Sequence, residues 1–145
     1  MKIKVINGPN LNMLGVRKTE IYGTESLESI RLELKALSHE KGVELDFFQS
    51  NHEGELIDEI QGCYRDVDGI IINPGALTHY SIAIRDAIEA VSVPTIEVHI
   101  TNIFAREEFR HHSVISPVCK GTIAGVGTYG YQLALQGLLA MLKAL

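Results

Sequence analysis

Short runs rich in β-branched residues alternate along the chain with longer stretches in which apolar residues recur every three or four positions. The short runs predict five strands, at residues 3–6, 43–49, 69–73, 94–99 and 122–126. The run at 69–73 is almost continuously apolar, which is typical of a central parallel strand buried on both faces. Pro94 fits this pattern because proline is tolerated at the start of a strand.

The stretches between the strands predict amphipathic helices. The first begins after Ser26 as N-cap and stops at Gly42. Its apolar face consists of Leu27, Ile30, Leu34 and Leu37. The inner face of the second helix consists of Leu56, Ile57, Ile60 and Tyr64, and a third helix covers Ile82–Val91.

The last predicted helix, at residues 131–145, is apolar on more than one side. Its apolar residues are Leu133, Leu135, Leu138, Leu139, Met141, Leu142 and Leu145. A helix that is apolar nearly all round is normally buried on several sides. In so short a chain this predicts subunit contacts, and therefore a homo-oligomer.

The alternation of strands and helices predicts an α/β fold. Without a linker or an internal repeat, we expect a single flavodoxin-like domain over residues 1–145, with a doubly wound parallel sheet in the order 2-1-3-4-5 and helices on both faces. Ligands of such sheets bind beyond the carboxyl ends of the strands. Polar residues follow three of the predicted strands: Asn7 and Asn10, then Asn73 and His79, then Glu97, His99 and Thr101.

Composition and charge narrow the classes of function. Apolar residues make up 46% of the 145 residues, and no apolar run approaches the roughly 20 residues that span a bilayer. The net charge of −5 argues against a nucleic-acid-binding face, which needs concentrated positive charge. No signal-peptide core opens the chain, so we expect a cytoplasmic protein. Cys63 and Cys119 lack disulfide or metal-site spacing, and we expect them to be reduced.

Residues 7–15, Asn-Gly-Pro-Asn-Leu-Asn-Met-Leu-Gly, are unusually rich in amides for a turn. They do not match a phosphate loop, which would need a different glycine spacing and a lysine. Asn7 and Asn10 could bond their own backbone as turn residues, so a purely structural role stays open here.

Arg17 and Tyr22 lie between Gly15 and Gly23, and this arrangement resembles a lid with glycine hinges over a site. A free phenol has a pKa of about 10, so a tyrosine base at neutral pH needs about 4 kcal/mol from nearby positive charge. An arginine beside the ring supplies such charge. Taken singly, each of the two residues is equally compatible with an ordinary surface role.

Glu97 and His99 lie two apart on a predicted strand, so their side chains share one face. A carboxylate beside a histidine sets its tautomer and orientation and makes it a natural proton donor. A buried structural histidine is the alternative. His79 invites a similar interpretation at the start of the third helix, and Asp86, seven residues later, would share its helix face unless it is a plain surface charge.

A metal site and a serine nucleophile are weaker alternatives. His79, Glu97 and His99 could converge, but no common metal-binding spacing occurs. No glycine-flanked elbow surrounds Ser81 or Ser113. We therefore expect neither a metal nor another cofactor.

Two classes of function stay open from the residues alone. An enzyme would use the two candidate pairs, a tyrosine beside an arginine and a histidine beside a carboxylate, for proton transfer. A non-catalytic flavodoxin-like module for a nucleotide, flavin or phosphate would carry serines or threonines after the first strand, where this chain has amides. The amides favour the enzyme.

Three segments, in the right order over nearly the whole chain, resemble the type II 3-dehydroquinase family. The first is the amide-rich stretch 7–15 with Arg17 and Tyr22. The second is Asn-Pro-Gly-Ala-Leu-Thr-His at 73–79 with Asp86 after it, and the third is Glu-Val-His-Ile-Thr-Asn at 97–102 with Ala-Arg-Glu-Glu-Phe-Arg-His-His at 105–112. Lys18 and Thr19 stand where this family usually has Glu-Pro.

The resemblance implies a 3-dehydroquinate dehydratase, a hydro-lyase of the shikimate pathway. Such an enzyme removes water from 3-dehydroquinate by anti elimination through an enolate and gives 3-dehydroshikimate. The resemblance implies Tyr22 as base, Arg17 as lid residue and phenolate stabiliser, and Asn10 as holder of a water at the enolate oxygen. It implies His99, oriented by Glu97, as the acid.

The resemblance also implies the substrate-binding residues. Asn73 and the backbone amides of Ile100 and Thr101 would bind the carboxylate and a hydroxyl of the substrate. The ring hydroxyls would be bound by His79, Arg110 and Asp86 of a neighbouring subunit. The family further implies a dodecamer built from trimers, in agreement with the apolar last helix.

Overall fold

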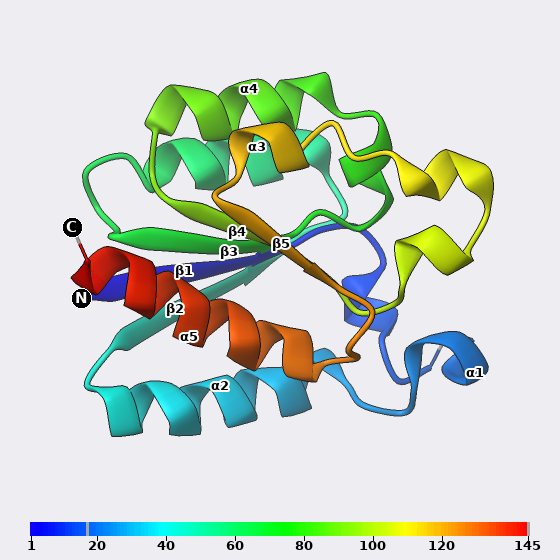
Figure 1. Ribbon diagram of the computed structural model, residues 1–145, viewed down its shortest axis with the longest axis horizontal. Coiled ribbons are helices and arrows are strands. Elements are labelled where there is room, and N and C mark those ends of the chain that lie inside the picture. Colours follow the sequence, from blue (N-terminus) through cyan, green and yellow to red (C-terminus); the bar gives the residue numbers. More distant parts are fainter. Residues whose placement is uncertain (17, 145) are drawn as a thin grey trace.

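A computed structural model describes residues 1–16 and 18–144, and it contains a five-stranded parallel sheet between two layers of helices (Figure 1). The strands are β1 (Lys2–Asn7), β2 (Glu44–Gln49), β3 (Gly69–Asn73), β4 (Thr95–His99) and β5 (Gly121–Ala124). They lie in the order β2-β1-β3-β4-β5, which confirms the predicted flavodoxin-like sheet.

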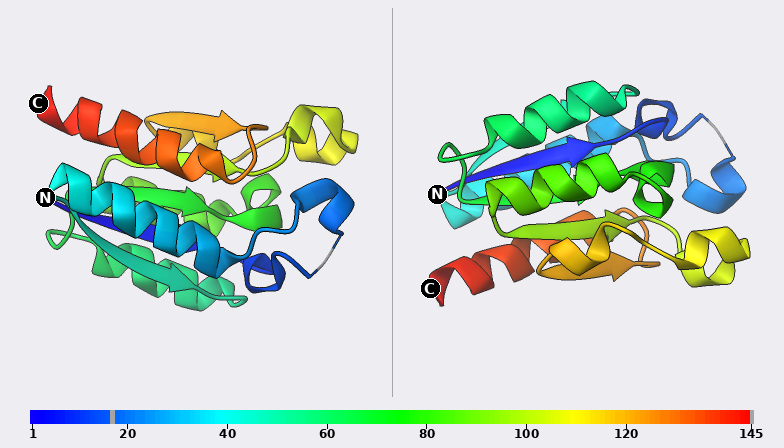
Figure 2. Two further views of the ribbon diagram at one scale, coloured as in Figure 1. Left: turned by 90° about the horizontal axis from the view of Figure 1, so that it is seen from below. Right: turned by 90° about the horizontal axis from the view of Figure 1, so that it is seen from above.

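Two pairs of helices cover the sheet. Figure 2 shows α2 (Leu27–Lys41) and α5 (Tyr129–Lys143) on one face, and α3 (Glu53–Gly62) and α4 (Ile82–Val91) on the other. The remaining helices are short: α1 (Thr19–Tyr22), η1 (Leu11–Met13), η2 (Gly75–His79), η3 (Ile103–Ala105), η4 (Glu108–His111) and η5 (Ser116–Val118). Within residues 1–16 and 18–144, no helix combines the length and the apolar character needed to cross a bilayer.

The boundaries of α2 follow from its capping residues. The hydroxyl of Ser26 accepts a hydrogen bond from the backbone N–H of Ser29, and the hydroxyl of Ser29 accepts one from the N–H of Ser26, both at 3.1 Å. This reciprocal capping satisfies N–H groups that the helix itself leaves without partners. Gly42 ends the helix at φ +67°, a left-handed conformation that favours glycine. The predicted cap and stop are confirmed.

The alternation of side chains along the strands divides the core into two parts. Ile96 and Val98 of β4 belong to the core beneath α2 and α5. Because alternate residues of a strand point to opposite faces, Glu97 and His99 face the layer of α3 and α4. Strand β3 is buried at all five positions, as predicted for a central strand. The alternation of side chains along β4 thus places Glu97 and His99 on the same face of the sheet.

Three sequence predictions are corrected by the structure. Tyr64 does not belong to the inner face of α3, because the helix ends at Gly62 and Tyr64 is 54% exposed. Strand β5 ends at Ala124 rather than 126, since Gly125 turns the chain at φ +90°. His79 and Asp86 do not share one helix: His79 ends η2, and a separate helix, α4, starts after Ser81 as N-cap.

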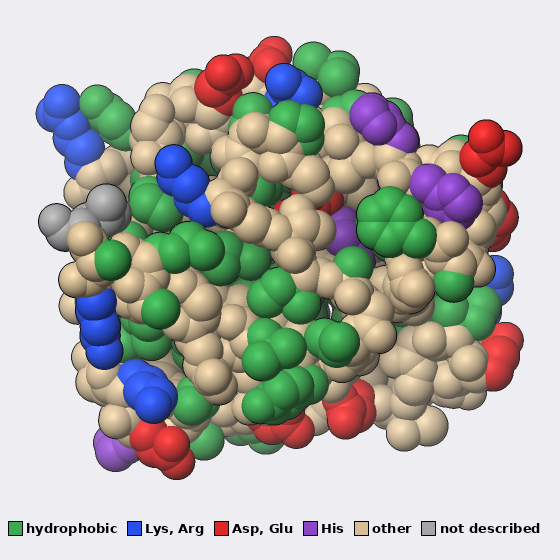
Figure 3. Space-filling view, viewed as in Figure 1, with side chains coloured by type: hydrophobic (Ala, Val, Ile, Leu, Met, Phe, Trp, Pro, Cys, Tyr) green, Lys and Arg blue, Asp and Glu red, His purple; other side chains and the backbone are tan. Residues whose placement is uncertain are grey.

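Hydrophobic side chains gather over α5 and the turn before it (Figure 3). Val126, Tyr129 and Met141 are exposed there by 50, 52 and 40%. On the core side of α5, Leu135 and Leu138 are completely buried, whereas Leu133 and Leu142 are half-buried. The last helix therefore carries apolar side chains on its solvent side as well as its core side.

Candidate active site

A cavity of about 170 Å³ lies beyond the carboxyl ends of β1, β3 and β4. It is the crevice that the polar ends of the three strands predicted. Eight predicted site residues line it: Asn10, Tyr22, Asn73, His79, His99, Ile100, Thr101 and Arg110. Apolar residues such as Leu14 and Ile103 complete the wall, so polar groups of defined position meet a partly apolar surface.

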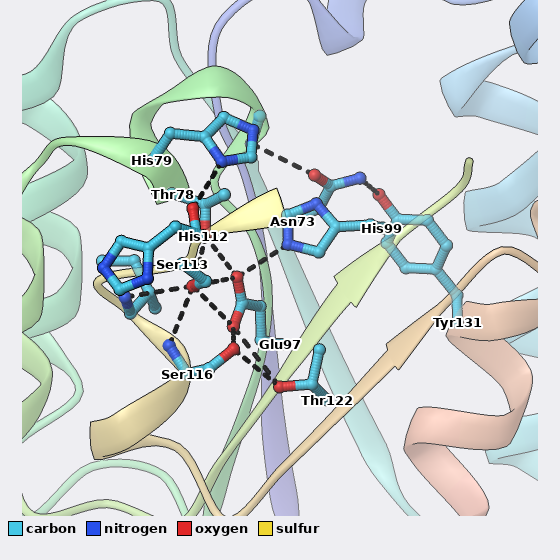
Figure 4. A network of polar contacts seen from close by, with 12 residues as sticks. Asn73, Thr78, His79, Glu97, His99, His112, Ser113, Ser116, Thr122 and Tyr131 are labelled. Carbon is cyan, nitrogen blue, oxygen red and sulfur yellow. Dashed lines mark hydrogen bonds and ion pairs between the residues drawn. The ribbon is translucent and has the colours of Figure 1, made fainter. Parts of the chain in front are cut away.

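His99 and Glu97 form a buried pair at the end of β4. Nε2 of His99 lies 2.6 Å from Oε1 of Glu97, and the residues are 6% and 0% exposed. His99 lines the cavity while Glu97 lies behind it (Figure 4). The contact predicted from their spacing of two along a strand is therefore present.

The carboxyl group of Glu97 is held as an anion by its neighbours. Burial by itself opposes ionisation, but hydrogen bonds from His99, Ser116 and Thr78 outweigh it and lower the pKa of Glu97 to about 2. At neutral pH the group behind His99 is therefore a carboxylate.

Asn73 is fixed by a buried tyrosine of the last helix (Figure 4). Its Nδ2 donates to the hydroxyl of Tyr131 at 2.9 Å, and its Oδ1 accepts from the N–H of Gly75 at 3.1 Å. The Tyr131 hydroxyl in turn donates to Oδ1 of Asn7 at 2.5 Å. These partners determine which end of the Asn73 amide is the nitrogen, and they leave its second N–H hydrogen to point elsewhere.

His79 and His99 both line the cavity, with their rings facing each other. The two rings are stacked with centroids 6.5 Å apart and an interplanar angle of 18°. Nδ1 of His79 lies 2.8 Å from the carbonyl oxygen of His112, which only accepts, so Nδ1 carries the hydrogen. Burial is the main reason that the pKa of His79 is lowered, so the ring is neutral at pH 7 and Nε2 is an acceptor.

Tyr22 closes α1 and lines the same cavity. The guanidinium carbon of Arg106 lies 5.2 Å from the centroid of the Tyr22 ring, and an Arg106 N–H donates to Oγ1 of Thr101 at 3.4 Å. Arg106 follows η3. The N-cap of this helix is Asn102, whose side chain accepts a hydrogen bond from the N–H of Phe104 at 3.1 Å. The short helix η3, capped by Asn102, thus places the guanidinium of Arg106 against the ring of Tyr22.

The family model for "Dehydroquinase class II" matches residues 1–139. The chain belongs to the class II dehydroquinase family. It is 58% identical over 143 residues to the 3-dehydroquinate dehydratase of Sulfurovum sp. (strain NBC37-1), covering 99% of this chain and 88% of that protein. The 3-dehydroquinate dehydratase of Campylobacter jejuni subsp. jejuni serotype O:23/36 (strain 81-176) is 59% identical over 139 residues, covering 96% and 87%.

Solved dehydroquinase structures have the same fold. The crystal structure of the type II dehydroquinase from Butyrivibrio crossotus DSM 2876 superposes with a TM-score of 0.94 at 54% identity, covering 96% of this chain and 97% of that one. The type II dehydroquinase from Propionibacterium acnes gives a TM-score of 0.92 at 45% identity, with 96% of each chain covered. The sheet order and helix layers described above are those of a dehydroquinase.

The structure of one chain leaves the predicted roles of two residues, Arg17 and Asp86, as predictions. Arg17 lies outside the described residues. Asp86 is exposed on α4 and does not belong to the cavity lining of one chain, as far as residues 1–16 and 18–144 define it. The prediction that Asp86 acts in a neighbouring subunit stays a prediction.

Several residues that contact Tyr22, Asn73 or Glu97 were not predicted from the sequence to belong to the site. They are Thr78, Arg106, Ser113, Ser116, Thr122 and Tyr131. Thr78 and Arg106 lie within the motifs that carry the resemblance, so position in a motif was an available signal. The others come from the last third of the chain, and no local pattern links them to Glu97 or Asn73.

Proposed function

We propose that this chain, a type II 3-dehydroquinate dehydratase by its family, eliminates water from 3-dehydroquinate in the cavity described above. One observation carries the assignment of the site: a tyrosine beside a guanidinium and a histidine bound to a buried carboxylate line one cavity. A base and an acid on one cavity are what elimination through an enolate requires.

Tyr22 is the proposed base, which takes the proton from C2 of the substrate. Its position supports this role, because Tyr22 lines the cavity and the guanidinium of Arg106 lies against its ring. Arg17 is proposed to add to this charge when the segment between Gly15 and Gly23 closes over the substrate. Both glycines have positive φ, +88° and +78°, and so provide backbone freedom at the two ends of that segment.

Asn10 is the proposed holder of the water that stabilises the enolate oxygen. It adopts a left-handed conformation at φ +70°, and its backbone N–H donates to Oδ1 of Asn51 at 2.9 Å. Asn10 also belongs to the lining of the cavity. A polar group fixed before the reaction stabilises developing charge without reorganisation.

His99 is the proposed acid, which protonates the C1 hydroxyl as the C–O bond breaks. Asn73 and the backbone amides of Ile100 and Thr101 are proposed to bind the carboxylate and a hydroxyl of the substrate. The ring hydroxyls are assigned to His79, Arg110 and a neighbouring subunit's Asp86. The neutral His79 ring supports this, because its Nε2 is an acceptor for a hydroxyl donor.

The proposal includes a homo-oligomer, with a dodecamer built from trimers as the expected form, and a cytoplasmic location in the shikimate pathway. The exposed apolar side chains on α5 and before it support subunit contacts.

The test is direct. Purified protein is mixed with 3-dehydroquinate, and the conjugated enone of the product is followed in the ultraviolet. We expect a continuous rise in absorbance that is the same with and without a metal chelator. No rise would contradict the proposed function and would favour a non-catalytic binding module, and loss of the rise with chelator would contradict a metal-free mechanism.

A further inference from the structure

Glu97 lies at the centre of a cage of hydroxyl groups (Figure 4). We call this set the hydroxyl cage: Thr78, Ser113, Ser116 and Thr122, all of which contact the carboxylate. They come from η2, the loop after η4, η5 and β5. The last three segments are neighbours in sequence, whereas Thr78 lies 35 residues before Ser113. The register of the sheet contributes, because Thr122 is the partner of Glu97 across β4 and β5.

The direction of the hydrogen bonds can be worked out at Ser113. Its Oγ accepts from the backbone N–H of Ile115 at 3.1 Å and of Ser116 at 3.0 Å. A hydroxyl has two acceptor positions and one hydrogen. Both acceptor positions are used, so the hydrogen of Ser113 must be donated, and its acceptor is Glu97 at 2.9 Å.

The hydroxyls of Thr78 and Ser116 also donate to the carboxylate of Glu97. Thr78 contacts Ser113, whose acceptor positions are filled, so the Thr78 hydrogen goes to Oε1 of Glu97. Ser116 donates to Oε2 and lies 2.9 Å from the hydroxyl of Thr122, which can donate to it in turn. The hydroxyl hydrogens of the cage therefore all run toward the carboxylate.

A carboxylate that receives these donors has no room for a proton of its own. It offers about four acceptor positions, and three hydroxyls together with His99 use them. Since Glu97 can only accept, Nε2 of His99 must be the donor in the 2.6 Å contact. The ring nitrogen of His99 that can gain and lose a proton is then Nδ1.

We propose that Ser113 and Ser116 are positioning residues for the elimination: by directing their hydrogens to Glu97 they fix the Nε2–H form of His99, so that Nδ1 delivers the proton to the leaving hydroxyl. The substrate side of this inference rests on the proposed function. In the step, the enolate electrons form the C1=C2 bond and the C1–O bond breaks. His99 enters the step doubly protonated, with hydrogens on both Nε2 and Nδ1. The oxygen takes the Nδ1 proton and leaves as water, and His99 becomes neutral with its remaining hydrogen on Nε2.

The charge of Glu97 supports this inference. Burial raises the pKa of Glu97, but His99 first and then the hydroxyls of Ser116 and Thr78 lower it to about 2, so the group is a carboxylate at neutral pH. The titratable groups that sense this charge are His99 on β4, His79 on η2 and Cys119 after η5. Arg106 and Arg110 belong to the cavity wall. Burial raises the pKa of Glu97 and the hydrogen bonds from the hydroxyls lower it. Removal of one hydroxyl should therefore raise this pKa.

The first test reads the tautomer of His99 directly and does not depend on catalysis. Protein labelled with ¹⁵N in its histidines is studied by NMR at a pH where the ring is neutral, and the His99 signals are assigned by their loss in His99→Gln. We expect Nε2 to carry the hydrogen and Nδ1 to carry none. A dominant Nδ1–H form would overturn the proposal.

The second test uses kinetics of Ser113→Ala and Ser116→Ala. We expect kcat to fall about tenfold with KM changed less than about twofold, since a hydrogen bond to a charged group is lost away from the substrate. The acid limb of the kcat profile should move to higher pH. Ser116→Thr, which keeps the hydroxyl, should restore both values. Ser38→Ala, which removes a buried serine hydroxyl on α2, is the matched control and should change neither.

The outcomes separate cleanly. Unchanged kcat and acid limb in the alanine variants, or equal losses in Ser116→Thr, would trace the cage to packing alone and overturn its positioning role. If a variant fails to fold, the NMR measurement on the unaltered protein still decides. If the protein does not convert 3-dehydroquinate at all, the proposed function fails, whereas the tautomer result still tests the hydroxyl cage.

Discussion

At the scale of single residues, Tyr22 combines a cavity position with a guanidinium on its ring. Tyr22→Phe removes the proposed base while the ring stays in place. We expect kcat to fall at least 100-fold, the lower range for a lost general base, with KM changed only a few-fold. The enone assay measures both. Tyr64→Phe, at an exposed tyrosine far from the cavity lining, is the control, and near-normal turnover in Tyr22→Phe would reject the assignment.

Tyr131 never touches the cavity in the single chain, yet its hydroxyl holds two amides at once. Tyr131→Phe leaves Asn7 Oδ1 and one Asn73 N–H buried without this partner, which costs about 1–3 kcal/mol of unfolding free energy. Because Asn73 is the proposed carboxylate ligand, KM should rise several-fold. Urea unfolding and steady-state kinetics test this, and an unchanged KM would show that Asn73 keeps its orientation without the tyrosine.

Glu97 makes stability depend on pH. Its pKa is lowered from 4.5 to about 2 in the folded chain, so its contribution is present above about pH 4.5 and is lost as the pH falls toward 2. A shift of this size corresponds to a contribution on the order of 3 kcal/mol. Urea unfolding at a series of pH values should show this loss, and Glu97→Gln should flatten that part of the curve. An equally steep loss in the variant would assign the acid sensitivity to other carboxyl groups.

At the scale of elements, local patterns predicted most of the fold. The bounds of β3 and α4 are as predicted, because each is a short apolar pattern closed by clear stop signals. Tyr64 was misplaced because helical spacing continues past Gly62, whereas the chain turns at Arg65 with φ +59°. Periodicity does not record where a helix gives way to a tight turn.

The segment between β4 and β5 was beyond such patterns. Its 3-10 helices are too short for a period, and their places depend on long-range contacts such as Ser116 with Glu97. Arg106 lies in one of the sequence motifs, but the motif does not predict its contact with Tyr22. That contact joins two segments far apart in sequence and forms only when the sheet has assembled. The contact between Glu97 and His99 was predictable because residues two positions apart on a strand share a face.

The junction of β1 and β3 has no space for an added side chain. A Cβ on Gly8 would overlap the carbonyl oxygen of Pro74, and the N–H of Gly8 donates to the Asn73 carbonyl at 2.8 Å. Gly8→Ala should therefore displace the loops that carry Asn10 and Asn73, with a loss of about 1–3 kcal/mol and of most activity. Gly54→Ala on α3 meets nothing within 4 Å and should be neutral or slightly stabilising. Chemical denaturation compares them, and equal stability would refute the overlap.

At the scale of the whole molecule, the exposed apolar side chains of Val126, Tyr129 and Met141 form the surface that we propose the homo-oligomer covers. Sedimentation at micromolar concentration should give a mass several times the 16.0 kDa of one chain, with twelve copies expected. Asp86→Ala should raise KM without reducing this mass, because Asp86 is proposed to reach a neighbour's substrate. A monomer with full activity would contradict both expectations.

The hydrogen bond from the Tyr131 hydroxyl to Asn7 joins the first strand to the last helix, which are 124 residues apart at these positions. During synthesis, β1 and β3 leave the ribosome long before α5 does. Until the final helix emerges, the two amides lack the hydroxyl that orients them. A nascent or prematurely terminated chain should therefore bind substrate more weakly than the full chain, even when its first four strands have paired.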